Sequence, residues 1–180
     1  PRYSVKTDWE VELGVVIGKR AKYVQQQDAY DYIAGYTIIN DISEREFQLE
    51  REGQWSKGKS HDTFGPVGPW MVTKDEIADV QDIDLWLDVD GERRQTGNTK
   101  TMIFGVAHLV HYISQFMTLE PGDVISCGTA FKPSENRKSI HHANFQDVAG
   151  PVEVTISGIG TLVNPVEIED RPIGKWRLNR

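Results

Sequence analysis

The stretch EVELGVVIG, residues 10–18, decides how the rest of the chain is interpreted. Its largely apolar run 13–17 is typical of a buried β-strand, and Glu10 and Glu12 stand two positions apart where that strand begins. Side chains at i and i+2 of a strand point to the same face, so the two carboxylates lie side by side. Like charges at that separation repel, and an apolar setting disfavours the charged form of each. The pair therefore either faces water or holds a cation between its members.

The rest of the chain predicts an α+β protein that is rich in strands. Apolar side chains recur at helical spacing through residues 102–117, which makes this segment the clearest helix. Asp90 and Gly91 give a hairpin signal after the alternating stretch 85–89. Residues 51–69 are rich in Gly, Ser and Pro, and we expect them to form a long loop. Further strands are expected at residues 36–40, 69–73, 124–126, 152–156 and 160–163, and a short helix at residues 26–34 that Gly35 ends.

The composition narrows the functions that this chain can have. Its 180 residues suit one domain with a sizeable core, and no apolar run approaches the roughly 20 residues of a membrane-spanning helix. The net charge of -7 disfavours nucleic acid as the main partner, because phosphate binding needs a basic surface. Cys127 is the only cysteine, so no internal disulfide can form, which fits a reducing compartment. We therefore expect a cytoplasmic protein that acts on a small molecule, without nucleic acid or a membrane as partner.

A third carboxylate follows the strand candidate YTIIN. Asp41, Arg45 and Gln48 are spaced by four and then three residues, so a helical turn would place them on one face. Asp41 would then add its oxygens to those of Glu10 and Glu12. Oxygen ligands of this kind suit a hard divalent cation such as Mg²⁺ or Mn²⁺. On spacing alone, carboxylates that simply face water are the alternative.

Five motifs of the chain are distinctive: EVELGVVIG (10–18), AGYTIINDISEREFQ (34–48), QWSKGKSHDTFGPVGPW (54–70), MIFGVAHLV (102–110) and FMTLEPGDVISCGT (116–129). They closely resemble motifs of the fumarylacetoacetate hydrolase family. They follow the family's order and cover nearly the whole chain. Their sequences are similar to those of bacterial members that act on 2,4-diketo acids from sugar-acid or aromatic catabolism.

The resemblance implies a fold, a metal and an oligomeric state. It implies one catalytic domain over residues 1–180, built as a mixed β-sandwich roll within the β-rich α+β class. It implies a Mg²⁺ or Mn²⁺ site, because Glu10, Glu12 and Asp41 match the family's metal ligands. Members of the family are usually dimers, so we expect a homodimer or a higher homo-oligomer.

The resemblance also implies a reaction and the residues that carry it. Arg45, Gln48 and Lys59 match catalytic positions around the substrate, and Thr129 matches a threonine that holds a substrate carboxylate. The implied enzyme is a hydrolase that cleaves a C–C bond of an acylpyruvate-like 2,4-diketo acid, releasing pyruvate and a second carboxylate. The keto acid would chelate the metal, which stabilises the enolate that forms. Lys59 would add positive charge near the same oxygen, and Arg45 would bind a carboxylate in bidentate fashion.

Two features depart from the family pattern. Family hydrolases take their general base from a His-Glu pair on a lid N-terminal to the E-x-E strand, and the nine residues before Glu10 hold no such pair. We therefore expect the lid to be absent from this chain, and one alternative is that the base lies on a region N-terminal to this sequence. His61 is a candidate substitute base or an ordinary half-buried histidine. The alternative functions are a decarboxylase of oxaloacetate or another β-keto acid, a hydroxymuconate-type isomerase, and a non-catalytic metal-binding relative. After Thr129 the family's proline and glycine-rich loop is replaced by AFKPSENRKSIHHANF, residues 130–145, so the exact substrate stays open.

Overall fold

The computed structural model describes residues 1, 4, 6–129 and 150–167. Short strands dominate these residues, and brief helical segments connect them. In chain order the elements are β1 (Thr7–Asp8), β2 (Val11–Ile17), the 3-10 helix η1 (Gln26–Tyr32), β3 (Ile33–Asn40), β4 (Ser43–Glu44), the π-helix η2 (Glu46–Glu50), α1 (Ser56–Lys59), β5 (Val67–Thr73), the 3-10 helix η3 (Lys74–Glu76), β6 (Asp84–Val89), β7 (Glu92–Asn98), the 3-10 helix η4 (Thr99–Thr101), α2 (Val106–Ser114), β8 (Val124–Thr129), β9 (Val152–Ile156) and β10 (Gly160–Asn164).

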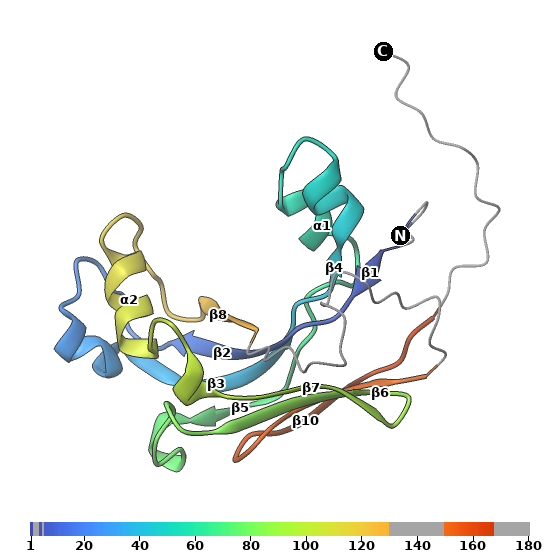
Figure 1. Ribbon diagram of the computed structural model, residues 1–180. Coiled ribbons are helices and arrows are strands. Elements are labelled where there is room, and N and C mark those ends of the chain that lie inside the picture. The colour runs from blue at the N-terminus through green and yellow to red at the C-terminus, as the bar shows by residue number, and fades with distance from the viewer. Residues whose placement is uncertain (2–3, 5, 130–149, 168–180) are drawn as a thin grey trace.

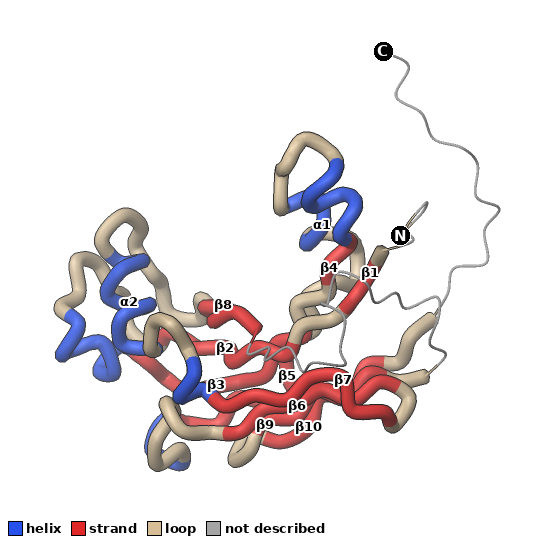
Figure 2. Tube along the Cα trace, viewed as in Figure 1, coloured by secondary structure: helices blue, strands red, loops and turns tan. Residues whose placement is uncertain are grey.

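The strands form two four-stranded sheets, ordered β5-β3-β2-β8 and β10-β9-β6-β7, and β1 pairs with β4 in a separate ladder. All of these pairs are antiparallel. The two sheets lie one above the other, with α1 beside β1 and β4 near one end of β2 and α2 near the other end (Figures 1 and 2). The strand-rich α+β class expected from the sequence is confirmed, and so is the hairpin, which joins β6 to β7.

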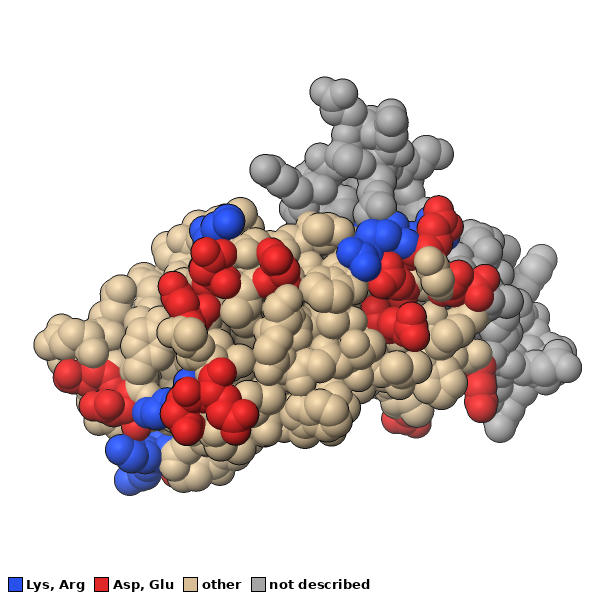
Figure 3. Space-filling view, turned by 90° about the horizontal axis from the view of Figure 1, so that it is seen from below, with Lys and Arg blue, Asp and Glu red and all other residues tan. Residues whose placement is uncertain are grey.

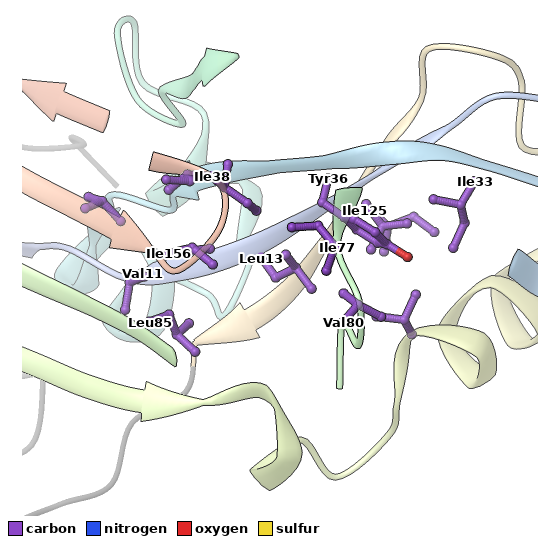
Figure 4. Packing of buried hydrophobic residues seen from close by; sticks show 14 of the residues in the cluster. Val11, Leu13, Ile33, Tyr36, Ile38, Ile77, Val80, Leu85, Ile125 and Ile156 are labelled. Carbon is purple, nitrogen blue, oxygen red and sulfur yellow. The ribbon is translucent and has the colours of Figure 1, made fainter. Parts of the chain in front are cut away.

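The strand β2 has one face in the core and one face toward the carboxylates. Val11 and Leu13 are at most 1% exposed and point between the sheets, where Leu85 of β6 lies close by (Figure 4). Burying a side chain of this size stabilises the fold by roughly 1.5–3 kcal/mol. Because the side chains of a strand alternate, this burial turns Glu10 and Glu12 to the opposite side of β2. The apolar positions of the sequence therefore fix the direction in which the carboxylates point.

The short helix predicted at residues 26–34 is present, but its predicted end is wrong. Residues Gln26–Tyr32 form a 3-10 helix, and the strand β3 begins at once with Ile33. Gly35 does not stop a helix, because it lies inside β3 opposite β5. A Cβ atom at this position would lie 2.1 Å from the carbonyl oxygen of Val72, so glycine permits the close approach of the two strands.

The predicted helix at residues 102–117 is real but shorter, because it begins at Val106 and ends at Ser114. Its start is set by a residue far away in the sequence: Oε1 of Gln81 accepts a hydrogen bond of 2.6 Å from the backbone N–H of Val106. Ile103 belongs to the apolar pattern but precedes the helix and is 91% exposed. Helical spacing therefore predicts the helix, whereas its first residue, Val106, is stabilised by a hydrogen bond to Gln81 that the spacing does not reveal.

The described part of the chain contains no helix that is both long and apolar enough to cross a membrane. On the face shown in Figure 3, acidic side chains gather in several groups and basic side chains lie beside them. This face is therefore mixed in charge, without a continuous basic surface.

Candidate metal centre

Three carboxylates meet where β2 begins. One oxygen atom from each of Glu10, Glu12 and Asp41 lies within 4.8 Å of the other two. Glu10 and Glu12 are 7% and 3% exposed, and Asp41 is half-buried just after β3. The backbone N–H of Asp41 donates a hydrogen bond of 2.9 Å to the carbonyl oxygen of Glu10, which ties the end of β3 to the start of β2. The structure thus brings together the three side chains that the sequence predicted as metal ligands.

Two donors on β8 fix the carboxylate of Glu12. Its Oε2 accepts hydrogen bonds from the hydroxyl of Ser126 and, at 2.8 Å, from the backbone N–H of Gly128. Burial raises the pKa of Glu12 to about 7, although these two hydrogen bonds oppose that shift. A buried carboxylate that is hard to ionise alone becomes a good ligand once a cation lies beside it.

Arg45 binds two carboxylates, that of Asp8 in β1 and that of Glu10 just before β2. Its Nε lies 2.9 and 3.1 Å from the two carboxylate oxygens of Asp8, its Nη2 lies 2.7 Å from Oε1 of Glu10, and its Nη1 donates at 3.0 Å to Oε1 of Gln48. Burial by itself lowers the pKa of Arg45, but the hydrogen bonds and charges of Asp8 and Glu10 raise it overall. All three guanidinium nitrogens are thus engaged by the fold, and Arg45 holds Glu10 in place. Binding of a substrate carboxylate by Arg45 stays a prediction.

Asp8 is the charged residue of this cluster that the sequence reasoning missed. It is fully buried, and only Arg45 among the described side chains forms an ion pair with it. The sequence does contain a signal for Asp8, because acidic residues stand at every second position, 8, 10 and 12, as on one face of a strand. The acidic pattern therefore begins at Asp8, two residues before Glu10, and not where the apolar strand begins.

Lys59 supplies the second positive charge. Its Nζ lies 2.8 Å from Oε2 of Glu10 and also donates to Oδ2 of Asp41, so it contacts two of the three candidate ligands. Burial lowers the pKa of Lys59, but the hydrogen bonds to Asp41 and Glu10 outweigh this and raise it. The ammonium group therefore stays charged inside the cluster.

Gly58 allows Lys59 to reach the cluster. A Cβ atom at Gly58 would lie 2.5 Å from Cβ of Gln48 and 2.6 Å from the carbonyl oxygen of Glu44, so only glycine lets α1 approach η2 this closely. The prediction of one long loop over residues 51–69 is thus wrong, because this segment contains α1 and the first residues of β5. Spacing in the sequence identifies the G-K pair, but only the packing shows why the glycine is needed.

Thr129 lies directly opposite Glu12 in the pairing of β2 with β8. Its hydroxyl donates a hydrogen bond of 2.9 Å to the carbonyl oxygen of Val11 and accepts one of 3.2 Å from Nε2 of Gln95. The hydroxyl is therefore used within the fold, and its contact with a substrate carboxylate stays a prediction. The replaced loop at residues 130–145 lies outside the described residues.

His61 lies among aromatic rings. Its ring centroid is 5.3 Å from that of Phe47 and 5.2 Å from that of Phe64. Its Nε2 is buried without a hydrogen-bond partner among the described residues, and burial lowers the pKa of the ring. Burial thus favours the neutral form of His61, and within the described structure the ring makes no hydrogen bond to the carboxylate cluster.

The charges of the cluster favour a divalent cation. Four carboxylates and two cationic side chains contact one another here, which leaves two negative charges when every group is ionised. An ion of charge +2 would balance them. The candidate ligands offer only carboxylate oxygens, which Mg²⁺ and Mn²⁺ prefer. The residues present therefore fit such an ion.

The chain is similar in sequence to known bacterial proteins. The chain is 64% identical over 129 residues to a protein of Burkholderia cenocepacia (strain HI2424) that has "hydrolase" in its name, which corresponds to 72% of this chain and 46% of that protein. The chain thus spans about half the length of the curated relatives that it matches.

Three solved structures resemble this one closely. The 2-hydroxyhepta-2,4-diene-1,7-dioate isomerase from Mycobacterium marinum is 41% identical with a TM-score of 0.80, and the match covers 94% of this chain and 62% of that one. The fumarylacetoacetate hydrolase from Exiguobacterium antarcticum is 36% identical with a TM-score of 0.82, covering 92% and 58%. The maleylpyruvate hydrolase from Sphingobium sp. SYK-6, in complex with manganese(II) and pyruvate, is 28% identical with a TM-score of 0.72, covering 88% and 53%.

The family model of the fumarylacetoacetate (FAA) hydrolase C-terminal domain matches residues 1–167, which is nearly the whole chain. With the sheet order and the carboxylate cluster described above, this match confirms the resemblance seen in the motifs. The chain belongs to the fumarylacetoacetate hydrolase family.

Proposed function

We propose that this chain carries the metal-dependent site of an enzyme that cleaves a C–C bond in a 2,4-diketo acid and releases pyruvate and a second carboxylate. The observation that carries the proposal is the approach of three carboxylate oxygens within 4.8 Å, with the ammonium group of Lys59 beside them. A relative in complex with manganese(II) and pyruvate supports both the ion and the product.

Glu10, Glu12 and Asp41 would hold Mg²⁺ or Mn²⁺. When bound, the ion supplies positive charge beside the keto oxygen that becomes negative as the C3–C4 bond breaks. Three protein ligands on an ion that prefers six leave room for a chelating keto acid. The hydrogen bonds to Glu12 and the ion pair between Glu10 and Arg45 hold these carboxylates in place before any substrate arrives.

Lys59 would act on the same negative charge as the metal. Its Nζ is half-buried and held in the ammonium form by two carboxylates, so it adds a second fixed positive charge at the site. Charge that is already in position stabilises a transition state without reorganisation of solvent. Gln48 would act indirectly, since its Oε1 accepts from Arg45 and orients the guanidinium that holds Glu10.

A second candidate is the isomerisation of a hydroxymuconate-type acid at the same centre. One observation favours it: the similar isomerase from Mycobacterium marinum is 41% identical, compared with 28% for the maleylpyruvate hydrolase. Hydrolysis requires a base that activates water, whereas isomerisation and the decarboxylation of a β-keto acid require only proton transfer or enolate stabilisation. The two candidates therefore differ in whether a water molecule must be activated.

The first experiment follows the enol absorbance of a simple acylpyruvate with metal-stripped protein, and again after addition of Mg²⁺ or Mn²⁺. Metal-dependent loss of absorbance, with pyruvate detected by a coupled lactate dehydrogenase assay, is the result expected for the hydrolase. Conversion of a 2-hydroxymuconate-type acid without pyruvate would favour the isomerase instead. If the protein binds the metal and changes neither substrate, the hydrolase and isomerase proposals are both wrong, which leaves a β-keto acid decarboxylase or a non-catalytic metal-binding relative.

A further inference from the structure

We infer that Gln95 is a positioning residue for the metal ligands, although it belongs to the opposite sheet. This inference rests on the metal site proposed above. Gln95 lies in β7, is 1% exposed, and reaches across the interior of the sandwich to the start of β2. A polar amide in this position is unusual, because the other side chains between the sheets are mostly aliphatic.

The amide of Gln95 completes a closed set of hydrogen bonds around one residue of β2. Its Oε1 accepts from the backbone N–H of Val11 at 2.9 Å, and its Nε2 donates to the hydroxyl of Thr129 at 3.2 Å. That hydroxyl in turn donates to the carbonyl oxygen of Val11 at 2.9 Å. Both peptide groups of Val11 are therefore held by two side chains.

The need for this arrangement follows from the sheet. The described pairing between β2 and β8 ends at Glu12 and Thr129, so Val11 lies one residue beyond the ladder. Its N–H and C=O are buried and would lack partners on that side. A glutamine can satisfy this position because one planar group offers both an acceptor and a donor.

Val11 lies between Glu10 and Glu12, and this links Gln95 to the metal. The peptide groups that Gln95 and Thr129 hold are the ones that join the two ligands, so their rotation would move both carboxylates at once. Metal–ligand distances in a well-formed site lie within about 0.2 Å of their usual values, so the positions of both carboxylates matter. Groups that orient the ligands without touching the ion typically change metal affinity by roughly 10- to 100-fold.

The test compares Gln95→Met with a matched control, Gln81→Met. Gln81 is also a glutamine whose Oε1 accepts a backbone N–H, that of Val106 at 2.6 Å, but it lies at the start of α2. Mn²⁺ affinity is measured by isothermal titration calorimetry, and unfolding by urea is followed on the same metal-free samples. We expect Gln95→Met to weaken Mn²⁺ binding by at least about 10-fold. Gln81→Met should keep the native affinity even where it unfolds at lower urea.

A second variant keeps the test decisive if Gln95→Met does not fold. Thr129→Val removes two hydrogen bonds of the set, the one to the carbonyl oxygen of Val11 and the one from Nε2 of Gln95, and leaves that between Gln95 and Val11. A loss of Mn²⁺ affinity of at least about 3-fold is therefore expected. Native affinity in a folded Gln95→Met, or in Thr129→Val when Gln95→Met is unfolded, would overturn the inference but not the metal site. If the native protein itself binds neither Mn²⁺ nor Mg²⁺, the proposed function and this inference both fail.

Discussion

The ammonium nitrogen of Lys59 lies 2.8 Å from Oε2 of Glu10, although 49 positions separate the two residues in the chain. The same nitrogen donates to Asp41, so one lysine contacts two of the three candidate metal ligands. Without a metal, the ammonium group provides the positive charge that these carboxylates need. A bound ion and Lys59 therefore compete for the same carboxylate oxygens, while both would stabilise negative charge on the same substrate.

Lys59→Met should tighten metal binding and reduce turnover. Removal of the ammonium group frees Glu10 and Asp41 and removes a repulsive charge, so we expect roughly tenfold tighter Mn²⁺ binding. Turnover of the acylpyruvate should fall by about 100-fold or more, because a preorganised charge is lost. Calorimetry and the enol assay measure the two effects. Lys57→Met on the same helix is the control, since Lys57 is exposed and bonds to the carbonyl oxygen of Arg51. Weaker binding in Lys59→Met would contradict this account.

Glu12→Gln should separate metal binding from folding. The amide keeps the shape of the carboxylate but is a poor ligand for a hard cation, so Mn²⁺ affinity should fall by about 100-fold or more. Because burial disfavours the charged form of Glu12, the metal-free variant should resist urea at pH 8 at least as well as the native protein. Glu76→Gln, at an exposed position, should change neither property. A Glu12→Gln variant that retains native affinity would remove Glu12 from the ligand set.

Metal affinity should depend on pH through Glu12. Burial raises the pKa of its carboxyl from 4.5 to about 7, so below pH 7 the ion must displace a proton. We expect Mn²⁺ affinity to fall by about tenfold for each pH unit below 7 and to level off above it. Calorimetric titrations between pH 5.5 and 8 provide the measurement. An affinity that stays constant over this range would show that Glu12 is ionised throughout.

The same shift predicts the pH dependence of stability in the metal-free protein. Between pH 4.5 and about 7 the folded state keeps a proton on Glu12 that the unfolded chain has released. The stabilisation from this group is therefore fully present below pH 4.5 and is lost as the pH rises through 7. Saturating Mg²⁺ should restore stability at pH 8, and urea unfolding with and without the ion measures both effects. A Glu12→Gln variant should lose the part of this pH dependence that Glu12 contributes and keep the part from the buried Asp8, whose pKa burial also raises to about 7.

Gly58→Ala should displace Lys59 from the cluster. The added Cβ would lie 2.5 Å from Cβ of Gln48 and 2.6 Å from the carbonyl oxygen of Glu44, so α1 must move away from η2. Overpacking of this kind destabilises a fold by about 1–3 kcal/mol. Turnover should fall as in Lys59→Met, while Ser56→Ala on the exposed side of α1 should behave as the native protein does. The urea midpoint and the enol assay record the two effects.

Much of the site could be predicted from the sequence because its signals are local. A period of two residues places Glu10 and Glu12 on one face of a strand, and an apolar run places the opposite face in the core. The helical turn expected for Asp41, Arg45 and Gln48 is only partly right, since Asp41 precedes the short strand β4 and the helix starts after it. Asp41 still lies in the carboxylate cluster and Arg45 still bonds to Glu10, whereas Gln48 reaches the cluster only through its hydrogen bond with Arg45.

By itself, the sequence determined the strand-rich class, the family and the identity of the three acidic candidate ligands, because alternation along a strand and motif order are properties of neighbouring residues. The tertiary structure decided the rest. Only the packed chain shows that Asp8 forms an ion pair with Arg45 and that Gln95 reaches across the sandwich to Val11. It also shows that Gly58 allows the close packing that places Lys59 beside Glu10. These contacts join segments 37 to 84 positions apart, and they depend on how sheets pair and stack, which no local periodicity encodes.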